Sequence, residues 1–513
     1  MINIIIFFKT IENFAGFLLL FGLGSVWAYY CFKKDKSFTL TPLIVISALL
    51  LLAWGMVTGV DVDEIEHLHC SWLVYSGFVP FKDFWQHHAP MLWIILAPFF
   101  KILKPSSEIL TLSRIFFGLV YGLIILSGWK LAQKVWQGKA RLAMYLLIVF
   151  ATGIMGQFLC ARPDPFATLF LLIFIYWCLE IPGKRLISSF WAGICFGIAM
   201  SFIFKQYLLF FLPFILIFKV GKGSRAAKIV AYLTGVFFGV LPLAFYLFNQ
   251  GVAKEFLFWV IRYNQKRIIF SADFPVAVTV LGGWGVYLLV KRYLVYKDSR
   301  ALVLCAAFFL STLSSFTHPF LGLPSYFLEF WYILCAVAGC GQTFQSLIKR
   351  VPSMLHRSLV SGLFFAMILS PNIVALTFHN ISYFSFDKKV IGQLIKYGAK
   401  DSCLTILPYH PIFSRDVSRL YSYWQFNLSE EFLELRDDIR SKDLAAEVRK
   451  LRPAVVLSVL DKREFLLELY QKMLISKQEY NDLNDFLQTG YTFKAIGKNG
   501  YYIRNDKIEI PRK

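Results

Sequence analysis

Residues 61–90 read DVDEIEHLHCSWLVYSGFVPFKDFWQHHAP, and they gather acidic and histidine side chains into one short part of an otherwise apolar chain. Five of the fourteen carboxylates in residues 1–380 lie in this stretch, as do four of the eight histidines of the whole chain. Ionisable side chains are costly near a bilayer and tend to mark function where they occur there. We therefore expect this stretch to carry the chemistry and the surrounding segments to present it.

The composition is typical of a membrane protein, because 57% of the 513 residues are hydrophobic and only 17% are charged. Soluble domains carry about 25% charged residues. The net charge of +21 is spread unevenly: residues 1–380 hold 31 Lys/Arg against 14 Asp/Glu, and residues 381–513 hold 22 against 18. The basic excess thus lies mainly between apolar segments, where it orients a membrane protein. We expect no nucleic-acid partner.

About twelve apolar segments are long enough to span a bilayer, since a span needs about 20 residues and somewhat fewer when its flanks reach the headgroups. The chain is therefore predicted to be a polytopic α-helical membrane protein, with a transmembrane part over 1–380 and a more polar tail over 381–513. The predicted spans lie near 14–32, 42–60, 110–131, 142–159, 165–180, 186–204, 206–220, 227–248, 275–292, 300–317, 325–345 and 358–378.

The short loops on alternate sides of these spans differ in charge. One set holds 20 of the 31 basic residues of the transmembrane part, and the positive-inside rule places it in the cytoplasm. The other set then faces outward, and it contains the amino terminus, residues 61–109, 162–164 and 249–274, and the tail. Every loop with candidate chemistry falls on this outer side.

Two segments of the first outer loop are expected to lie at the membrane interface. Glu64–Tyr75 has apolar residues three or four positions apart, which predicts an amphipathic helix that lies with its apolar side toward the membrane. Ala89–Leu103 is apolar but only some fifteen residues long, which favours an interfacial or re-entrant segment over a span.

The tail alternates strand-like and helix-like stretches, which predicts a small extracytoplasmic α/β domain. Cys403 is its only cysteine, so the tail has no internal disulfide. The strand-like stretches are Leu404–Leu407, Ala454–Val459 and the aromatic runs on either side of Gly497–Gly500, and the helical ones are Glu430–Leu451 and Lys462–Leu474.

The acids at 61–66 have two interpretations. Asp63 is either a catalytic base or only the N-cap of a helix that begins at Glu64. A cap needs one acid, whereas Asp61, Asp63, Glu64 and Glu66 supply four. The crowding of these acids near a membrane surface favours the catalytic interpretation.

A divalent metal is an alternative for the same residues, because carboxylates and imidazoles are common ligands. Residues two apart on a helix point in different directions, so His67 and His69 are poor co-ligands there. The pairs Asp63 with His67 and Glu66 with His69 fit the helical spacing better. Metal dependence stays open at this point.

Other polar residues on the outer side each have a structural and a functional interpretation. His87 and His88 either end a polar loop or donate hydrogen bonds to a phosphate. Arg162 and Asp164, in a turn between two apolar segments, either pair with each other or complete a cavity against the first loop.

Two basic residues are further candidates for binding an anion. Lys205 interrupts two apolar segments, and it either reaches the outer headgroups or binds phosphate. Arg262 lies in the loop 249–274, on the side that the positive-inside rule disfavours for basic charge, which makes it a candidate for an anionic lipid headgroup.

The motifs VDEIEHLH, GFVPFKDFWQHHAPMLW and ARPDPF, taken in this order, resemble the GT-C membrane glycosyltransferases. The similarity is greatest to the bacterial branch near the aminoarabinose transferase of lipid A and to the protein O-mannosyltransferases. It covers the membrane part, and it is strongest over 61–98 and 160–170. The resemblance implies a bacterial cytoplasmic membrane enzyme that transfers a sugar, with inversion, from a polyprenyl-phosphate donor to a lipid, polysaccharide or protein acceptor at the outer face.

The resemblance also implies roles for single residues. Asp63 matches the acid that acts as general base on the acceptor hydroxyl, and Glu64 and Asp164 complete the catalytic set. Relatives place a lysine before the first proline of this motif, where this chain has His88-Ala89-Pro90. The candidates for the contact to the donor phosphate are therefore His88, Lys205 and Arg262. The residues expected to bind substrate are Glu66, His67, His87, His88, Arg162, Lys205 and Arg262.

Two functions of other classes remain as alternatives. A transporter or flippase of lipid-linked glycans should distribute its charges through the spans around a central path, whereas here they gather at one face. A structural or assembly protein would use the tail to bind partners.

Overall fold

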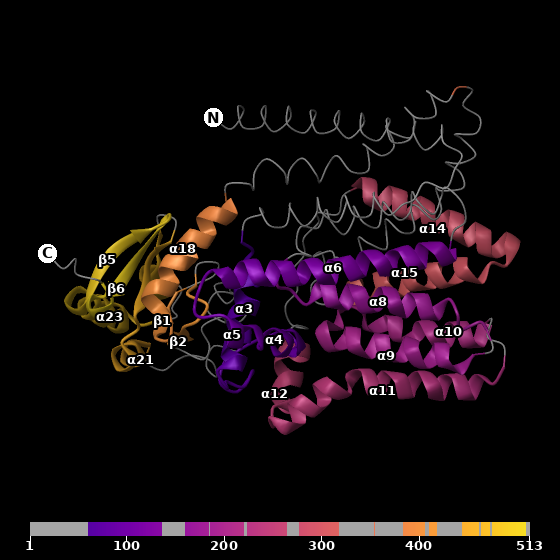
Figure 1. Ribbon diagram of the computed structural model, residues 1–513, viewed down its shortest axis with the longest axis horizontal. Helices are drawn as coiled ribbons and strands as arrows, with labels where there is room; N and C mark the ends of the chain where they lie inside the picture. The colour runs from indigo at the N-terminus through magenta and orange to yellow at the C-terminus, as the bar shows by residue number, and fades with distance from the viewer. Residues whose placement is uncertain are drawn as a thin grey trace.

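The computed structural model describes residues 60–135, 160–183, 185–219, 223–263, 276–317, 353, 383–405, 410–417, 444–460, 463–471 and 475–508. Long helices lie side by side along the long axis of the molecule, and a β-sheet with its helices lies at one end (Figure 1). Short helices from the loop 61–109 lie between these two parts. The expected spans at 14–32, 142–159, 325–345 and 358–378, and nearly all of 42–60, lie outside the described residues.

The helical part of the expected fold is confirmed wherever the predicted spans fall on described residues. Two of these helices, α6 and α11, are long and apolar enough to cross a membrane, while α8, α9 and most of α15 are apolar but shorter. The total of twelve spans therefore stays a prediction. The long helices are α6 (Glu108–Val135), α8 (Asp164–Cys178), α9 (Leu186–Phe202), α11 (Arg225–Asn249), α14 (Val276–Tyr296) and α15 (Ser299–Thr317).

Small residues bring α9 and α11 into close contact. Each helix has a Gly-x-x-x-Gly pattern, Gly193 with Gly197 on α9 and Gly235 with Gly239 on α11. A Cβ atom added at Gly193 would lie 2.1 Å from the carbonyl oxygen of Tyr232. The backbones thus approach in the way that such patterns permit between membrane helices.

The expected span at 206–220 is not one regular helix. A 3₁₀ helix, η2 (Phe204–Phe211), leads into α10 (Leu212–Lys219), and Gln206 departs from helical dihedral angles. Ser311 Oγ on α15 donates a hydrogen bond to Gln206 Oε1 at 2.6 Å, and Leu208 N–H donates to Ser314 Oγ at 3.0 Å. Ser314 thus accepts a backbone N–H of η2, and Ser311 holds the side chain of Gln206, which an apolar periodicity cannot reveal.

The helix predicted at Glu64–Tyr75 is present as α3 (Val62–Tyr75) and begins two residues earlier. Asp61 is its N-cap, because the carboxylate accepts the backbone N–H of Asp63 at 2.9 Å. The capping role considered for Asp63 therefore belongs to Asp61, and Asp63 remains available for chemistry.

The expectation that α3 exposes one polar side is wrong. All eight residues from Glu64 to Ser71 are buried, because the tail and the segment Ala89–Leu103 cover the helix. Ile412 and Phe413 belong to the same hydrophobic core as Ile65 and Leu68. The segment Ala89–Leu103 folds as two short helices, α4 (Met91–Leu96) and α5 (Phe99–Ile102), which pack against α3.

The tail contains a mixed six-stranded sheet in the order β2-β1-β3-β6-β5, with β4 also paired to β3. The three strands β2, β1 and β3 are parallel, and β6 is antiparallel to both β3 and β5. This confirms the α/β character of the tail, while a domain boundary at 381 stays a prediction. The strands are β1 (Ser402–Leu404), β2 (Arg415–Asp416), β3 (Val455–Leu460), β4 (Arg463–Glu464), β5 (Tyr491–Ile496) and β6 (Asn499–Arg504).

The loop 61–109 and the tail share their hydrophobic cores. Trp85 of the loop lies in the core of the tail. On α18 (Tyr383–Gly398), Val390 contributes to that core and Ile391 to the core of the long helices. The tail is thus packed directly onto the loop that carries the candidate site. The remaining helices are α12 (Ala253–Phe256), η3 (Leu257–Tyr263), α21 (Leu444–Leu451), α22 (Phe465–Gln471), α23 (Lys477–Gly490) and η5 (Asn505–Lys507).

Candidate active site

Arg162 joins the turn before α8 to the start of α3. Its guanidinium contacts the carboxylate of Asp63 and lies 3.4 Å from Asp61 Oδ1 and 3.8 Å from Asp164 Oδ2. Of the two interpretations of Arg162 and Asp164, the structure therefore favours a set completed against the first loop. One guanidinium among three carboxylates leaves an excess of acid at this point.

The three acids of α3 differ sharply in exposure. The side chain of Asp63 is 26% exposed, whereas Glu64 and Glu66 are buried. Burial raises the pKa of the neighbouring Asp61, an effect that Arg162 opposes. A substrate can therefore reach Asp63 more easily than either glutamate.

Glu64 is paired inside the protein rather than open to substrate. Arg114 of α6 donates from Nε to Glu64 Oε1 at 2.9 Å and from Nη2 to Oε2 at 2.7 Å, and both side chains are fully buried. This bidentate geometry suits a contact that fixes α3 against α6. The sequence analysis missed Arg114, although it is a lone arginine in the predicted span 110–131.

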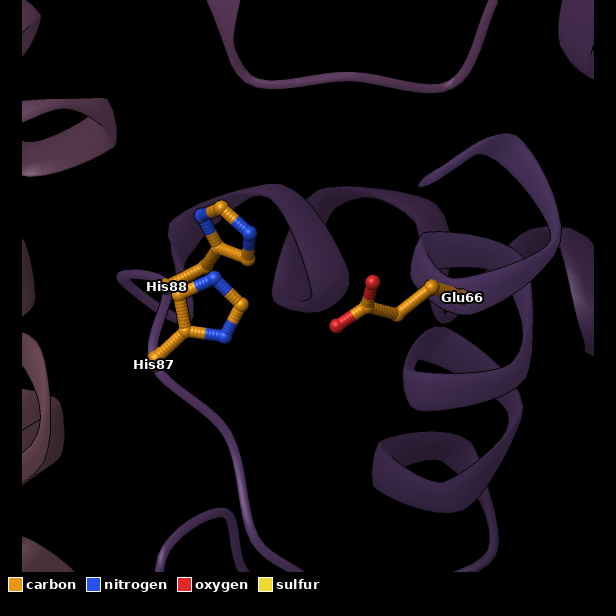
Figure 2. Close-up of side chains that lie close together, drawn as sticks. All are labelled: Glu66, His87 and His88. Carbon is orange, nitrogen blue, oxygen red and sulfur yellow. The ribbon is translucent and has the colours of Figure 1, made fainter. Parts of the chain in front are cut away.

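Glu66, His87 and His88 lie close together. Figure 2 shows the carboxylate of Glu66 pointing toward the two imidazoles, and one potential ligand atom from each residue lies within 4.8 Å of the others. Gln86 Nε2 also donates to Glu66 Oε1 at 2.6 Å. The donor set of one carboxylate and two imidazoles is one that divalent transition metals accept. These three residues are therefore the candidate ligands for a divalent metal near the site. His69, which helical spacing had paired with Glu66, faces Asp416 of the tail instead.

His67 is a neutral imidazole with its proton placed by a neighbour. Burial, followed by the charge of Arg162, lowers the pKa of His67 to about 3. Trp93 Nε1–H donates to His67 Nδ1 at 3.0 Å, so the proton of the neutral ring is on Nε2. This buried Nε2 has no hydrogen-bond partner among the residues that the structure describes, and it can donate to a substrate oxygen.

The ring of His88 packs against the rings of His67 and His87. Its ring centroid lies 5.0 Å from that of His67 and 4.0 Å from that of His87. Burial lowers the pKa of His88 well below its ordinary range, and His87, His67, Lys205 and Arg162 lower it further. Lys205 and Arg162 are the two permanently cationic residues among the causes of this lower pKa.

Arg262 does not join this group. It is exposed near the end of η3, and its side chain makes no hydrogen bond or ion pair with the residues that the structure describes. The other nine predicted site residues belong to the first loop, the turn before α8 and η2. Arg262 is on η3, which packs against the first loop through Trp259 and Trp85, but its own side chain is exposed.

A cavity of about 360 Å³ opens between the first loop and the tail. Its lining includes Asp83 from the loop and Lys400, Arg415 and Asp416 from the tail. No signal in the sequence indicates this cavity, because its two walls are more than 300 residues apart.

No protein-family model and no curated protein sequence matches the chain. Solved structures do. ArnT from Cupriavidus metallidurans bound to undecaprenyl phosphate is 12% identical, with a TM-score of 0.59 over 92% of this chain and 99% of ArnT. The Archaeoglobus fulgidus oligosaccharyltransferase tethered with an acceptor peptide is 12% identical, with a TM-score of 0.55 over 93% of this chain and 75% of that one. The same enzyme, AglB, in complex with an inhibitory peptide and a dolichol-phosphate has a TM-score of 0.52.

Both neighbours are glycosyltransferases of the GT-C fold. The chain has the GT-C fold, and the fold expected from the motifs at 61–98 and 160–170 is confirmed.

Proposed function

We propose that this chain is an inverting glycosyltransferase of the bacterial cytoplasmic membrane. It moves a sugar from a polyprenyl-phosphate donor to a lipid, polysaccharide or protein acceptor at the outer face. The observation that carries this proposal is the position of Asp63, a partly exposed acid at the start of a buried helix, in contact with Arg162 and on the same side as His67 and His88.

Asp63 acts as the general base in this mechanism. Its carboxylate takes the proton of the acceptor hydroxyl, whose oxygen forms a bond to the anomeric carbon. The bond from that carbon to the phosphate oxygen breaks, and the polyprenyl phosphate leaves with the electron pair. Attack from the face opposite the leaving group inverts the anomeric centre. Arg162 holds the base in place through its guanidinium, and Asp164 holds Arg162 from the other side.

The departing phosphate needs donors and positive charge. Lys205 supplies the charge, and the Nε2–H of His67 supplies a buried hydrogen-bond donor next to His88. His88-Ala89-Pro90 stands where relatives have a lysine before the first proline, so Lys205 replaces that lysine as the cation. A divalent cation held by Glu66, His87 and His88 would add further charge near the same oxygens.

Glu64 has a positioning role in this account. Its pair with Arg114 fixes the first turn of α3 and hence the direction of Asp63. The ligands in the neighbouring structures, undecaprenyl phosphate in ArnT and dolichol-phosphate in AglB, support a lipid-phosphate donor. The cavity between the first loop and the tail would bind part of the acceptor.

Reconstitution in vesicles with lipid-linked sugar donors tests this function. We expect the sugar to appear on an acceptor and free polyprenyl phosphate to accumulate in equal amount. Deleting the gene should remove one sugar from surface glycans or lipids, as detected by mass spectrometry. Translocation of the lipid-linked sugar without any transfer product would contradict the proposal and favour a transporter.

A further inference from the structure

Three polar side chains from distant parts of the chain converge where the tail covers α3. His69 Nε2 lies 2.9 Å from Asp416 Oδ2, and His410 Nε2 lies 3.2 Å from Asp416 Oδ1. One potential ligand atom from each of these residues lies within 4.8 Å of the other two. The side chains of His69, His410 and Asp416 are 3%, 0% and 9% exposed. The group plays no part in the sugar transfer proposed above.

The ring of His69 has a defined orientation. His69 Nδ1 lies 2.8 Å from the carbonyl oxygen of Ile412, an acceptor, so Nδ1 carries a proton. In the neutral ring, Nε2 then presents a lone pair to the carboxylate of Asp416. Two acceptors at this separation require a cation or a further proton between them. A metal-bound histidine has this pattern, with one nitrogen toward the metal and the other donating to a backbone carbonyl.

His410 presents its Nε2 to the other oxygen of the same carboxylate. The rings of His69 and His410 lie with their centroids 4.1 Å apart. Protons satisfy both contacts only if His69 is positively charged and His410 carries its proton on Nε2. A single metal ion satisfies both neutral rings through their lone pairs and binds the carboxylate as well. The convergence of two imidazoles on one buried acid therefore favours a shared cation.

The fold of the tail brings two of these residues to α3. Strands β1 and β2 pair in parallel, Asp416 is on β2, and His410 lies in the segment that connects the two strands. Ile412 of the same segment belongs to the same hydrophobic core as Leu68 of α3. The separation of 347 residues between His69 and Asp416 explains why the sequence does not reveal the group.

The donor set and the distances fit a divalent transition metal. Two imidazoles and a carboxylate bind zinc with bond lengths of about 2.0–2.2 Å, which separates tetrahedral ligand atoms by roughly 3.3–3.6 Å. The observed separations of 2.9 and 3.2 Å are only slightly shorter. Three protein ligands leave a coordination position for water. Asp416 also lines the cavity between the loop and the tail, so this cavity offers an entry path for the ion and room for that water.

We propose that His69, His410 and Asp416 bind a divalent transition-metal ion that joins α3 to the tail. The ion would hold the tail over the helix that carries Asp63. Its binding free energy would stabilise this arrangement, because the three ligands are assembled only when the tail is docked.

Metal analysis of the full-length chain tests the site. The protein in detergent, without an affinity tag and stripped with a chelator, is dialysed against Zn²⁺, and its bound zinc is measured by elemental mass spectrometry. His410→Gln and Asp416→Asn should each lose about one equivalent of zinc per chain, because each removes a ligand. Cys403→Ser is the matched control and should keep that zinc, since its sulfur lies 3.2 Å from His410 Nε2 but outside the ligand group.

A second measurement separates this site from the group of Glu66, His87 and His88 and uses a chain with all three proposed ligands. His87→Gln removes a potential ligand of that other group. In this variant, Zn²⁺ should still slow hydrogen exchange in peptides covering 410–417, which belong to the tail alone. The result remains decisive if His410→Gln misfolds. Equal zinc in the unaltered chain and a folded His410→Gln, or exchange over 410–417 that Zn²⁺ leaves unchanged, would overturn the proposal.

Discussion

Arg162 Nη2 contacts Asp63 Oδ2, and this contact joins the turn before α8 to the first turn of α3. The same guanidinium is within 4 Å of Asp61 and Asp164. The planar fork of an arginine holds carboxylates in fixed directions, whereas the ammonium of a lysine is a point charge with rotatable donors. The base of the proposed reaction is thus held by a group with a specific shape.

Arg162→Lys should therefore lower kcat about 10- to 100-fold, because the charge remains while the orientation of Asp63 is lost. The measurement is the rate of sugar transfer in vesicles at saturating donor and acceptor. Arg300→Lys, at an exposed arginine of α15, is the matched control and should leave kcat unchanged. An unaltered kcat in Arg162→Lys would show that Arg162 does not orient Asp63 for the reaction.

Arg114→Met should destabilise the protein by about 3–5 kcal/mol, because it leaves the buried carboxylate of Glu64 without its counter-charge. Replacing both partners, Glu64→Leu with Arg114→Met, should recover most of that loss. Thermal unfolding in detergent measures both effects.

The same double variant separates the two roles considered for Glu64. If Glu64 only positions α3, the stable double variant should retain transfer within about tenfold of the unaltered rate, since no group that contacts substrate is lost. A double variant that is stable but inactive would instead show that Glu64 takes part in catalysis.

Lys205→Ala should raise the KM for the lipid-linked donor at least about tenfold and lower kcat as well, because the charge that it removes would bind the donor phosphate and stabilise the larger charge of the departing phosphate. Arg262→Ala is the matched control, as it removes an equal charge from an exposed position outside the cluster, and it should change the KM less than about twofold. A larger rise in KM for Arg262→Ala than for Lys205→Ala would indicate that Arg262, and not Lys205, binds the donor phosphate.

Gly235→Ala should destabilise the helical part by roughly 1–3 kcal/mol, because the added Cβ would lie 2.1 Å from the carbonyl oxygen of Phe190 and force α9 and α11 apart. Gly122→Ala on α6 is the control, since a Cβ there meets nothing within 4 Å and should leave stability unchanged or slightly improved. Thermal unfolding of the two variants compares them. Equal midpoints would show that the close approach of α9 and α11 is not needed.

The sequence predicts local features of this protein well, because they depend on neighbours in the chain. The apolar spacing in Glu64–Tyr75 locates α3 to within two residues, and the order of motifs at 61–98 and 160–170 indicates the GT-C fold. The apolar run Ala454–Val459 likewise predicts β3 (Val455–Leu460) as a buried strand, whereas the run Leu404–Leu407 shares only Leu404 with β1.

Features that depend on distant partners are not predicted. The burial of Glu64–Ser71 on α3 depends on packing against α4 and α5 and on the tail, whose Ile412 and Phe413 are more than 330 residues away. Helical spacing assigned His69 to Glu66, yet the ring turns toward Asp416 because the tail supplies a stronger polar partner there. Periodicity along one helix carries no information about such contacts.

The central claim is that Asp63 is the general base. Asp63→Asn keeps the size and shape of the side chain and removes its basicity, so we expect the transfer rate to fall about 10²- to 10⁴-fold while the protein stays folded. Asp482→Asn, at a partly exposed acid of α23 that pairs with Arg449, is the matched control and should transfer sugar at an unaltered rate. The rate of product formation by folded Asp63→Asn in donor-loaded vesicles is the most direct measurement: a loss of this size is the result expected, and transfer at the rate of the unaltered protein would contradict the account.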